Sequence, residues 1–84
     1  MTILQKLTFY TKENCLLCEE AFQLVEMFAH EYPIEIEAVD IYKDEVLLEQ
    51  YHLLIPVVKM KNKELVGPDV TIENIANMVQ EACS

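Results

Sequence analysis

The sequence contains few residues that break or loosen a folded chain. Glycine occurs once and proline three times, whereas apolar residue types make up 52% of the 84 residues. This composition excludes a disordered segment and a glycine- or proline-rich array. Long hydrophobic runs are also missing, because no run approaches the roughly 20 apolar residues that cross a bilayer. We expect one small domain, residues 1–84, with room for a single core.

Positive charge is scarce as well. Fifteen acidic residues stand against six lysines and arginines, which gives a formal net charge of −9. An acidic surface repels phosphate, so nucleic acid and anionic membranes are excluded as partners. Residues 1–6 lack the basic segment and the long apolar stretch of a secretory signal. We therefore expect a cytoplasmic protein, and we expect it to be a monomer.

Hydrophobic periodicity predicts the order strand, helix, strand, helix, strand, strand, helix. The strands are expected at 6–10, 34–41, 57–61 and 64–66. A helix between the first two strands implies a right-handed parallel crossover, and a tight turn at Asn62-Lys63 implies an antiparallel hairpin. The fold class is therefore α/β, with a four-stranded mixed sheet flanked by helices.

Polar residues mark where the helices are expected to begin and end. Asn14, Asp44 and Thr71 are expected to cap the three helices. Pro33 ends the first helix, and His52 is expected in a left-handed conformation at the end of the second. Two sets of apolar residues are expected to face the core: Val46, Leu47 and Leu48 in the second helix, and Ile72, Ile75, Ala76, Val79 and Cys83 in the last.

Two of the cysteines form a Cys-x-x-Cys motif, Cys15 to Cys18, where a predicted strand leads into a predicted helix. Unpaired N–H groups and the positive end of the dipole stabilise a thiolate at such a helix start. In these motifs the thiol pKa falls from about 8.5 to between about 3.5 and about 7.5. We therefore expect Cys15, at the exposed start, to attack a disulfide, and Cys18, one turn further in, to resolve the mixed disulfide. Lys12 favours the thiolate, whereas Glu19 and Glu20 oppose it.

The same motif allows other interpretations. It is also half of a structural zinc site, for which the other ligand candidates in the chain are Cys83, His30 and His52. No second Cys-x-x-Cys or histidine pair completes the usual ligand spacing, so we expect no metal within one chain. Two subunits that pool cysteines around zinc or an iron–sulfur cluster, and a non-catalytic adaptor, remain alternative functions.

These features resemble the thioredoxin superfamily, and most of all the small bacterial glutaredoxin-like proteins. The residues that carry the resemblance are the lead-in Tyr10-Thr11-Lys12, the Cys-x-x-Cys at a helix start, and Ile55-Pro56 just before a strand. The resemblance implies a thioredoxin-like fold and a thiol–disulfide oxidoreductase that reduces protein or glutathione-mixed disulfides. It also implies a cis-proline at Pro56 and a backbone at Ile55 that pairs with an extended substrate.

The resemblance further implies how a substrate is bound. Family glutaredoxins hold glutathione through a basic residue before the cysteines, here Lys12, and a glycine-rich turn, here Gly67-Pro68-Asp69. Gly67 and Asp69 fit that turn, but Pro68 removes a backbone donor. Leu16 and Leu17 replace the usual dipeptide between the cysteines and form an apolar rim that suits a protein or peptide. The expected partner is a disulfide-containing protein or glutathione as co-substrate, with no tightly bound cofactor.

Overall fold

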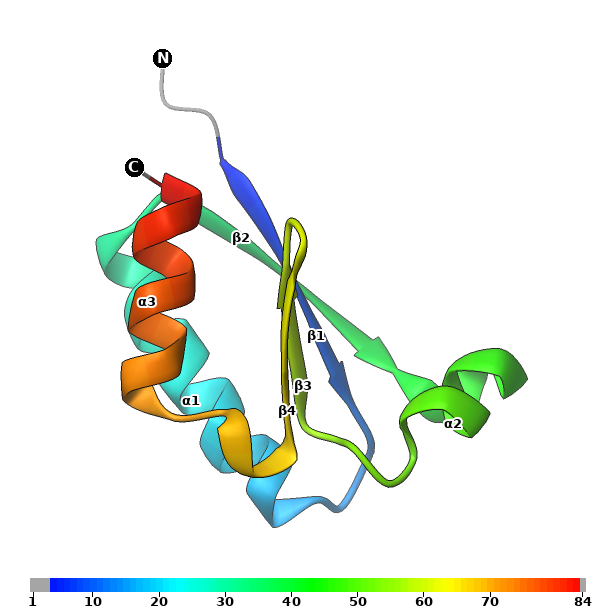
Figure 1. Ribbon diagram of the computed structural model, residues 1–84. Helices are drawn as coiled ribbons and strands as arrows, with labels where there is room; N and C mark the ends of the chain where they lie inside the picture. Colours follow the sequence, from blue (N-terminus) through cyan, green and yellow to red (C-terminus); the bar gives the residue numbers. More distant parts are fainter. Residues whose placement is uncertain (1–3, 84) are drawn as a thin grey trace.

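The computed structural model describes residues 4–83 (Figure 1). Four strands form one sheet in the order β2-β1-β3-β4. The strands are β1 (Gln5–Thr11), β2 (Ile34–Asp40), β3 (Val57–Met60) and β4 (Lys63–Val66). The α-helices are α1 (Leu16–Glu31), α2 (Glu45–Tyr51) and α3 (Ile72–Cys83), and the 3-10 turns η1 (Ile41–Lys43) and η2 (Gly67–Asp69) precede α2 and α3. The predicted order of elements is confirmed.

The sheet is mixed, as predicted. β1 and β2 run parallel, and Gln5 lies opposite Ile34 at one end of the register. β3 runs antiparallel to both β1 and β4. α1 makes the crossover between the parallel strands and lies with α3 on one side of the sheet, whereas α2 lies on the other side, beyond the end of β2 (Figure 1). Within residues 4–83 no helix is both long and apolar enough to cross a membrane.

The main core lies between the sheet and the helices α1 and α3. Because side chains alternate along a strand, Leu7 and Phe9 of β1 point to the same face as Val58 of β3. All three are buried, and Val25 of α1 and Val79 of α3 pack against them. Burial of each such side chain contributes roughly 1.5–3 kcal/mol, which fixes α1 against the strand that leads into it.

A smaller cluster lies on the opposite face of the sheet, under α2. Ile41, Tyr51 and Val57 are buried there. The Tyr10 and Tyr51 rings stack with centroids 4.5 Å apart, and the Tyr51 hydroxyl donates to Glu64 Oε2 at 3.0 Å. This cluster anchors the end of α2, and therefore the start of residues 52–56, which lead into β3.

The capping residues were predicted correctly for two helices. Asp44 and Thr71 cap α2 and α3, since each side chain accepts a hydrogen bond from the first turn. The prediction for α1 was wrong, because Cys15 and not Asn14 is the capping residue. Asn14 has a φ of 55° and turns the chain one residue earlier. The cysteine sulfur thereby takes the acceptor position that an oxygen usually holds at an N-cap.

Two turn predictions also need correction. His52 is right-handed, with φ −59° and ψ −26°, so the left-handed end expected for α2 is wrong. The hairpin turn lies at Lys61 and Asn62, one residue earlier than expected, because Met60 pairs with Lys63. Lys61 itself supplies the left-handed residue of this turn, with φ 52°.

The prediction of which residues in α2 and α3 face the core is confirmed only in part. Ile75 and Val79 are buried as predicted, and Cys83 is half-buried against the main core. Ile72 and Val46 are exposed instead, Val46 by 69%. Both lie in the first turn of their helix.

Candidate active site

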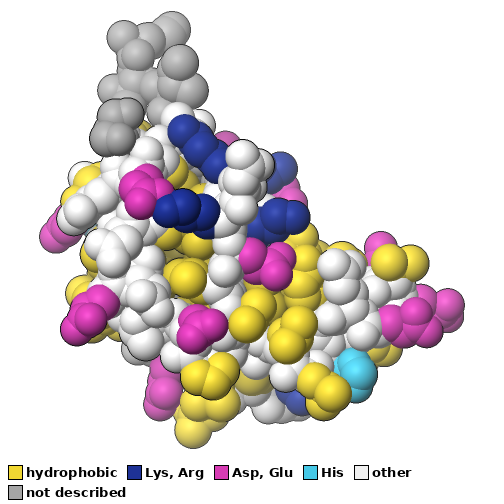
Figure 2. All heavy atoms as spheres, in the orientation of Figure 1, with side chains coloured by type: hydrophobic (Ala, Val, Ile, Leu, Met, Phe, Trp, Pro, Cys, Tyr) yellow, Lys and Arg dark blue, Asp and Glu magenta, His cyan; other side chains and the backbone are white. Residues whose placement is uncertain are grey.

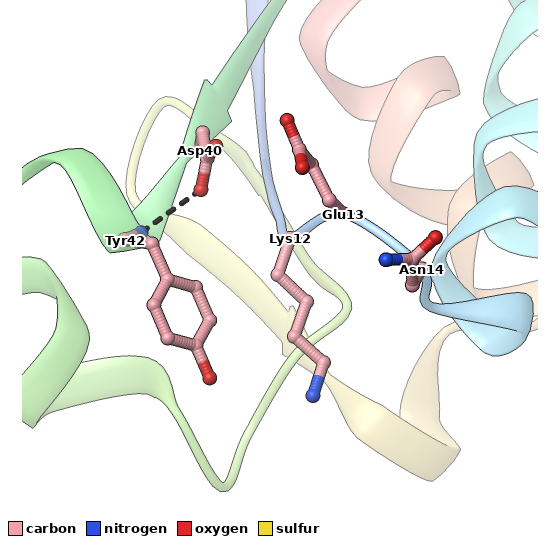
Figure 3. A pocket seen from close by; sticks show the side chains of 5 residues that line it. All are labelled: Lys12, Glu13, Asn14, Asp40 and Tyr42. Carbon is pink, nitrogen blue, oxygen red and sulfur yellow. Dashed lines mark hydrogen bonds between the residues drawn. The ribbon is translucent and has the colours of Figure 1, made fainter.

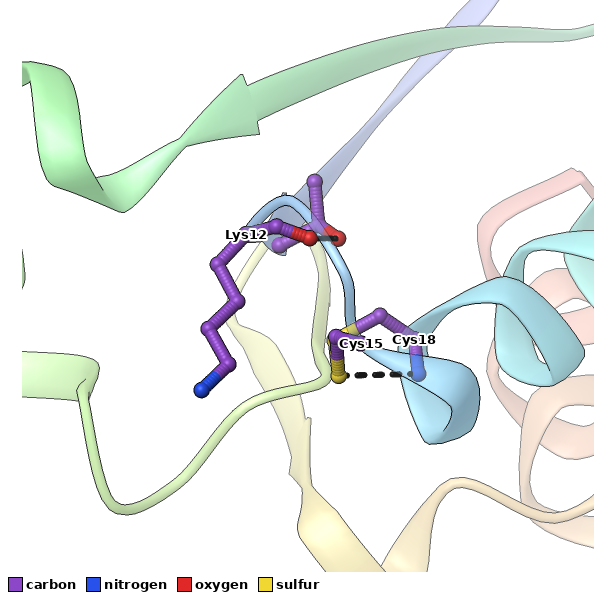
Figure 4. Close-up of a disulfide and its surroundings, with 4 residues drawn as sticks. Lys12, Cys15 and Cys18 are labelled. Carbon is purple, nitrogen blue, oxygen red and sulfur yellow. Dashed lines mark hydrogen bonds between the residues drawn. A yellow bond between two sulfur atoms is a disulfide. The ribbon is translucent and has the colours of Figure 1, made fainter.

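Cys15 and Cys18 form a disulfide at the start of α1 (Figure 4). Their Cα atoms are 5.2 Å apart. Residues three apart lie on one side of a helix, so the first turn of α1 brings the two side chains together. Cys15 is half-buried at the N-cap, whereas Cys18 is only 2% exposed because it lies against the core. The predicted division into an outer and an inner cysteine matches this geometry.

The backbone at this point favours a negative sulfur on Cys15. The Cys18 amide donates a hydrogen bond to the Cys15 sulfur at 3.2 Å (Figure 4). Cys15 has an extended backbone, with φ −119° and ψ 102°, which turns its side chain back over the first turn. An N–H donor and the positive end of a 16-residue helix both stabilise a thiolate relative to a thiol. Cys15 is therefore placed to act as a nucleophile when the pair is reduced.

Lys12 lies on the other side of the loop from this hydrogen bond. It lines a polar pocket of about 470 Å³ with Glu13, Asn14, Asp40 and Tyr42 (Figure 3). The Lys12 side chain runs alongside the Tyr42 side chain (Figure 3), and Asp40 accepts a hydrogen bond from the Tyr42 amide at 2.9 Å. Within residues 4–83 no hydrogen bond joins Lys12 to either cysteine.

A second and more apolar groove lies beside the disulfide. Its volume is about 480 Å³. The first half of α1 forms one wall, and the segment before β3 together with the η2 turn forms the other. Its lining residues are Leu17, Glu20, Ala21, Leu24, Leu53, Ile55, Pro56, Gly67, Pro68 and Val70.

The wall opposite α1 is held by backbone hydrogen bonds. The Ile55–Pro56 peptide bond is cis. The Gly67 amide donates to the Pro56 carbonyl at 2.9 Å and ties η2 to this segment. Gly67 has a φ of 46°, a conformation that glycine adopts without the usual cost. The Ile55 amide donates to the Tyr51 carbonyl at 3.1 Å, so of the Ile55 backbone only the carbonyl is left to pair with a substrate.

The predicted site residues separate into two regions. Leu17, Ile55–Pro56 and Gly67 line the apolar groove, whereas Lys12 lines the polar pocket. Leu16 is exposed outside both.

Asp69 lies in the η2 turn next to the groove and does not line it. Its carbonyl accepts from Thr71 N and from Asn74 Nδ2, the latter at 2.8 Å. Asp69 therefore joins η2 to the first turn of α3.

Sequence reasoning did not assign five of the lining residues to the site: Glu20, Ala21, Leu24, Leu53 and Val70. Glu20 had a detectable signal, because residues 17, 20, 21 and 24 recur at the spacing of one helix face. Leu53 and Val70 lie in irregular segments, where no periodicity marks which way a side chain points. Within residues 4–83, no group of three or more histidine, cysteine or acidic side chains is placed to hold a metal ion.

Comparison with solved structures defines the class of protein. The chain superposes on protein Ne2328 of Nitrosomonas europaea with a TM-score of 0.76 and 27% identity, over 94% of this chain and 95% of the other. A thioredoxin variant of Halobacterium salinarum gives a TM-score of 0.73 at 15% identity, over 94% and 74% of the two chains. The germline thioredoxin Deadhead of Drosophila melanogaster gives 0.65 at 21% identity, over 93% and 80%. The protein therefore has a thioredoxin fold, with a Cys-x-x-Cys pair at disulfide distance.

Sequence comparison then identifies the family. The model of the Glutaredoxin-like domain (DUF836) matches residues 6–80, so the chain belongs to this family. The resemblance to glutaredoxin-like proteins of the thioredoxin superfamily is thus confirmed. Among curated proteins, no sequence matches this chain.

Proposed function

We propose that this protein is a thiol–disulfide oxidoreductase whose Cys15–Cys18 dithiol reduces disulfides in proteins or glutathione-mixed disulfides. The observation that carries the proposal is the placement of the pair. Cys15 caps α1 and accepts a hydrogen bond from the Cys18 amide, while Cys18 is buried directly behind it. A nucleophilic outer thiol and a shielded inner thiol are what disulfide exchange through a mixed disulfide requires.

The reaction begins with the Cys15 thiolate, which attacks one sulfur of the substrate disulfide. The substrate S–S bond breaks, a mixed disulfide with Cys15 forms, and the departing sulfur takes a proton from water. The Cys18 thiol then gives its proton to water and attacks the Cys15 sulfur. The second substrate thiol leaves, and the dithiol has passed two electrons to the substrate and become the Cys15–Cys18 disulfide. A thiol reductant, such as glutathione or a thioredoxin-reductase system, restores the dithiol.

The test is a reductase assay with 2-hydroxyethyl disulfide as a small neutral substrate, run separately with each of these two reducing systems. Cys15→Ser should lose at least about a hundredfold in rate, because no other described thiol lies at a helix start. Cys18→Ser should accumulate a mixed disulfide on Cys15, visible by mass spectrometry.

Cys83→Ser is the matched control and should keep the wild-type rate, because Cys83 lies at the far end of α3. Retention of full activity by Cys15→Ser would contradict the proposal. If neither reducing system supports turnover and anaerobically purified protein carries zinc or an iron–sulfur cluster, a metal-binding module replaces it.

A further inference from the structure

Two hollows lie near the disulfide, a polar pocket that Lys12 lines and an apolar groove that Glu20 lines. The residues of the groove indicate which substrate the site would take. We infer that the physiological substrate is a polypeptide disulfide whose cysteine is flanked by an apolar residue and by a lysine or arginine, and that Glu20 selects the basic side chain. This inference rests on the proposed function and names the substrate class of the same site.

The apolar half of the inference comes from the groove. Leu17, which stands between the two cysteines, is 66% exposed, and Leu53 on the opposite wall is 83% exposed. In Figure 2, hydrophobic side chains gather at the lower end of the molecule, where Figure 1 shows the start of α1 and the η2 turn. Apolar side chains of a bound polypeptide would remove both leucines from water, which is favourable in proportion to the area covered.

The charge of the groove is negative. Glu20 is the one ionisable residue among its lining residues, and it lies one turn beyond Leu17 on the same face of α1. Within residues 4–83 no cation pairs with Glu20. A substrate lysine or arginine beside the attacked cysteine would therefore meet a carboxylate with no cationic partner.

Within the part of the chain that the structure describes, no lysine lines the groove. In Figure 2 most of the lysine atoms in view gather at the other end, near the β3–β4 hairpin, and a few show at the lower edge. At the hairpin, Lys63 pairs with Glu81, and Lys61 Nζ donates to the Ala82 carbonyl at 3.1 Å. Lys12 precedes Cys15 by three residues, and it lines the polar pocket described above and not the groove.

The same features disfavour glutathione. Glutathione carries two carboxylates and one ammonium group and is therefore an anion at neutral pH, so Glu20 opposes its net charge. The η2 turn offers one amide fewer than a glycine-rich turn, because Pro68 has no N–H. The Gly67 amide is already bonded to the Pro56 carbonyl. The groove therefore favours a basic polypeptide over the acidic tripeptide.

The test uses symmetric disulfide dimers of three short peptides: acetyl-Lys-Leu-Cys-Leu-Lys-amide, acetyl-Glu-Leu-Cys-Leu-Glu-amide and acetyl-Lys-Gly-Cys-Gly-Lys-amide. Symmetric flanks make the result independent of the direction in which the peptide binds. Pre-reduced protein reacts with each dimer, and the peptide thiol released is measured by chromatography. Wild type should prefer the Lys-Leu peptide over both others, and glutathione disulfide should react more slowly than that peptide.

Glu20→Gln should reduce the Lys-over-Glu preference by about two- to fivefold, the range of one exposed ion pair. Glu19→Gln is the matched control, because it removes the same charge next to Cys18 from a side chain outside the groove.

Leu53→Ser should reduce the Leu-over-Gly preference, whereas Val46→Ser, which changes an exposed residue outside the groove, should not.

Equal effects of the Glu19 and Glu20 variants would overturn the inference, since the preference would then follow from overall charge. Equal rates for all three peptides would overturn it too. In both cases reduction of 2-hydroxyethyl disulfide by the same protein leaves the proposed function standing. If that neutral substrate is also inert, the proposed function fails, and the inference with it.

Discussion

Tyr51 couples α2 to β4 through a single hydroxyl group. Its ring is almost fully buried, and the hydroxyl donates to Glu64. Burial, then the hydrogen bond and the negative charge of Glu64, raise the pKa of Tyr51 to about 12. The folded state therefore holds the phenolic proton more tightly than the unfolded chain, in which the pKa is close to 10. The resulting stability is complete below about pH 10 and is lost as pH rises toward 12.

We expect Tyr51→Phe to lose this alkaline dependence. In wild type the free energy of unfolding should fall by about 2 kcal/mol between about pH 10 and pH 12 from this group. The variant keeps the ring that stacks on Tyr10, so its free energy of unfolding at neutral pH should be lower than that of wild type by about 1 kcal/mol. Above pH 10 its free energy of unfolding should fall less with pH than that of wild type. Urea unfolding across this pH range measures both effects.

Tyr42→Phe is the control for that experiment, because Tyr42 is exposed and its side chain makes no described hydrogen bond. It should follow the wild-type curve. A Tyr51→Phe curve parallel to wild type over the whole alkaline range would refute the role given to this hydroxyl.

At the scale of elements, the short helix α2 positions one wall of the groove. Its seven residues are too few to form a stable helix alone, so it depends on its cap and on the cluster beneath it. The Leu54 and Ile55 amides both donate to the Tyr51 carbonyl at the end of α2. The segment that carries Pro56 is therefore tied to the end of α2.

Asp44→Ala should loosen this wall. The Asp44 carboxylate accepts from the Val46 and Leu47 amides at 2.9 and 3.3 Å, and loss of such a cap costs about 1 kcal/mol. Hydrogen exchange should become faster at the Leu48 and Ile55 amides, which depend on α2, and remain unchanged in α3. Glu49→Ala, an exposed acid later in α2 with no capping role, should leave both amides protected; equal exchange in the two variants would count against the proposed dependence.

At the scale of the whole molecule, stability comes from the core between the sheet and the helices α1 and α3. Val79 is fully buried there, whereas Val46 is exposed on α2. Val79→Ala should lower the free energy of unfolding by about 2 kcal/mol, through lost burial and the cavity left behind. Val46→Ala makes the same change in helix propensity and should stay within about 0.5 kcal/mol of wild type.

Denaturant unfolding of both variants, each with the disulfide intact, measures this difference. Equal losses of free energy in the two variants would contradict the larger contribution that the burial of Val79 predicts.

Local pattern was sufficient to predict much of this protein. Lys6 to Tyr10 alternates as a strand does, and Asp44 and Thr71 stand at the expected caps, because these signals act over a few neighbouring residues. The Cys-x-x-Cys motif at a helix start predicted the outer and inner cysteines for the same reason. Where two local signals compete, sequence was misleading: Asn14 is a good cap, yet the Cys15 sulfur holds that position.

The sequence alone established the order of elements, the Cys-x-x-Cys pair at a helix start and the acidic character of the chain, because each depends on near neighbours or on composition. Tertiary packing decided how the loops meet around the pair. It put Lys12 and Glu20 in separate pockets, and it brought Leu53 and Val70 to the groove that Leu17 lines. These residues come from separate parts of the chain, so their proximity depends on how α1, α2 and η2 pack at one end of the sheet, which no local pattern encodes.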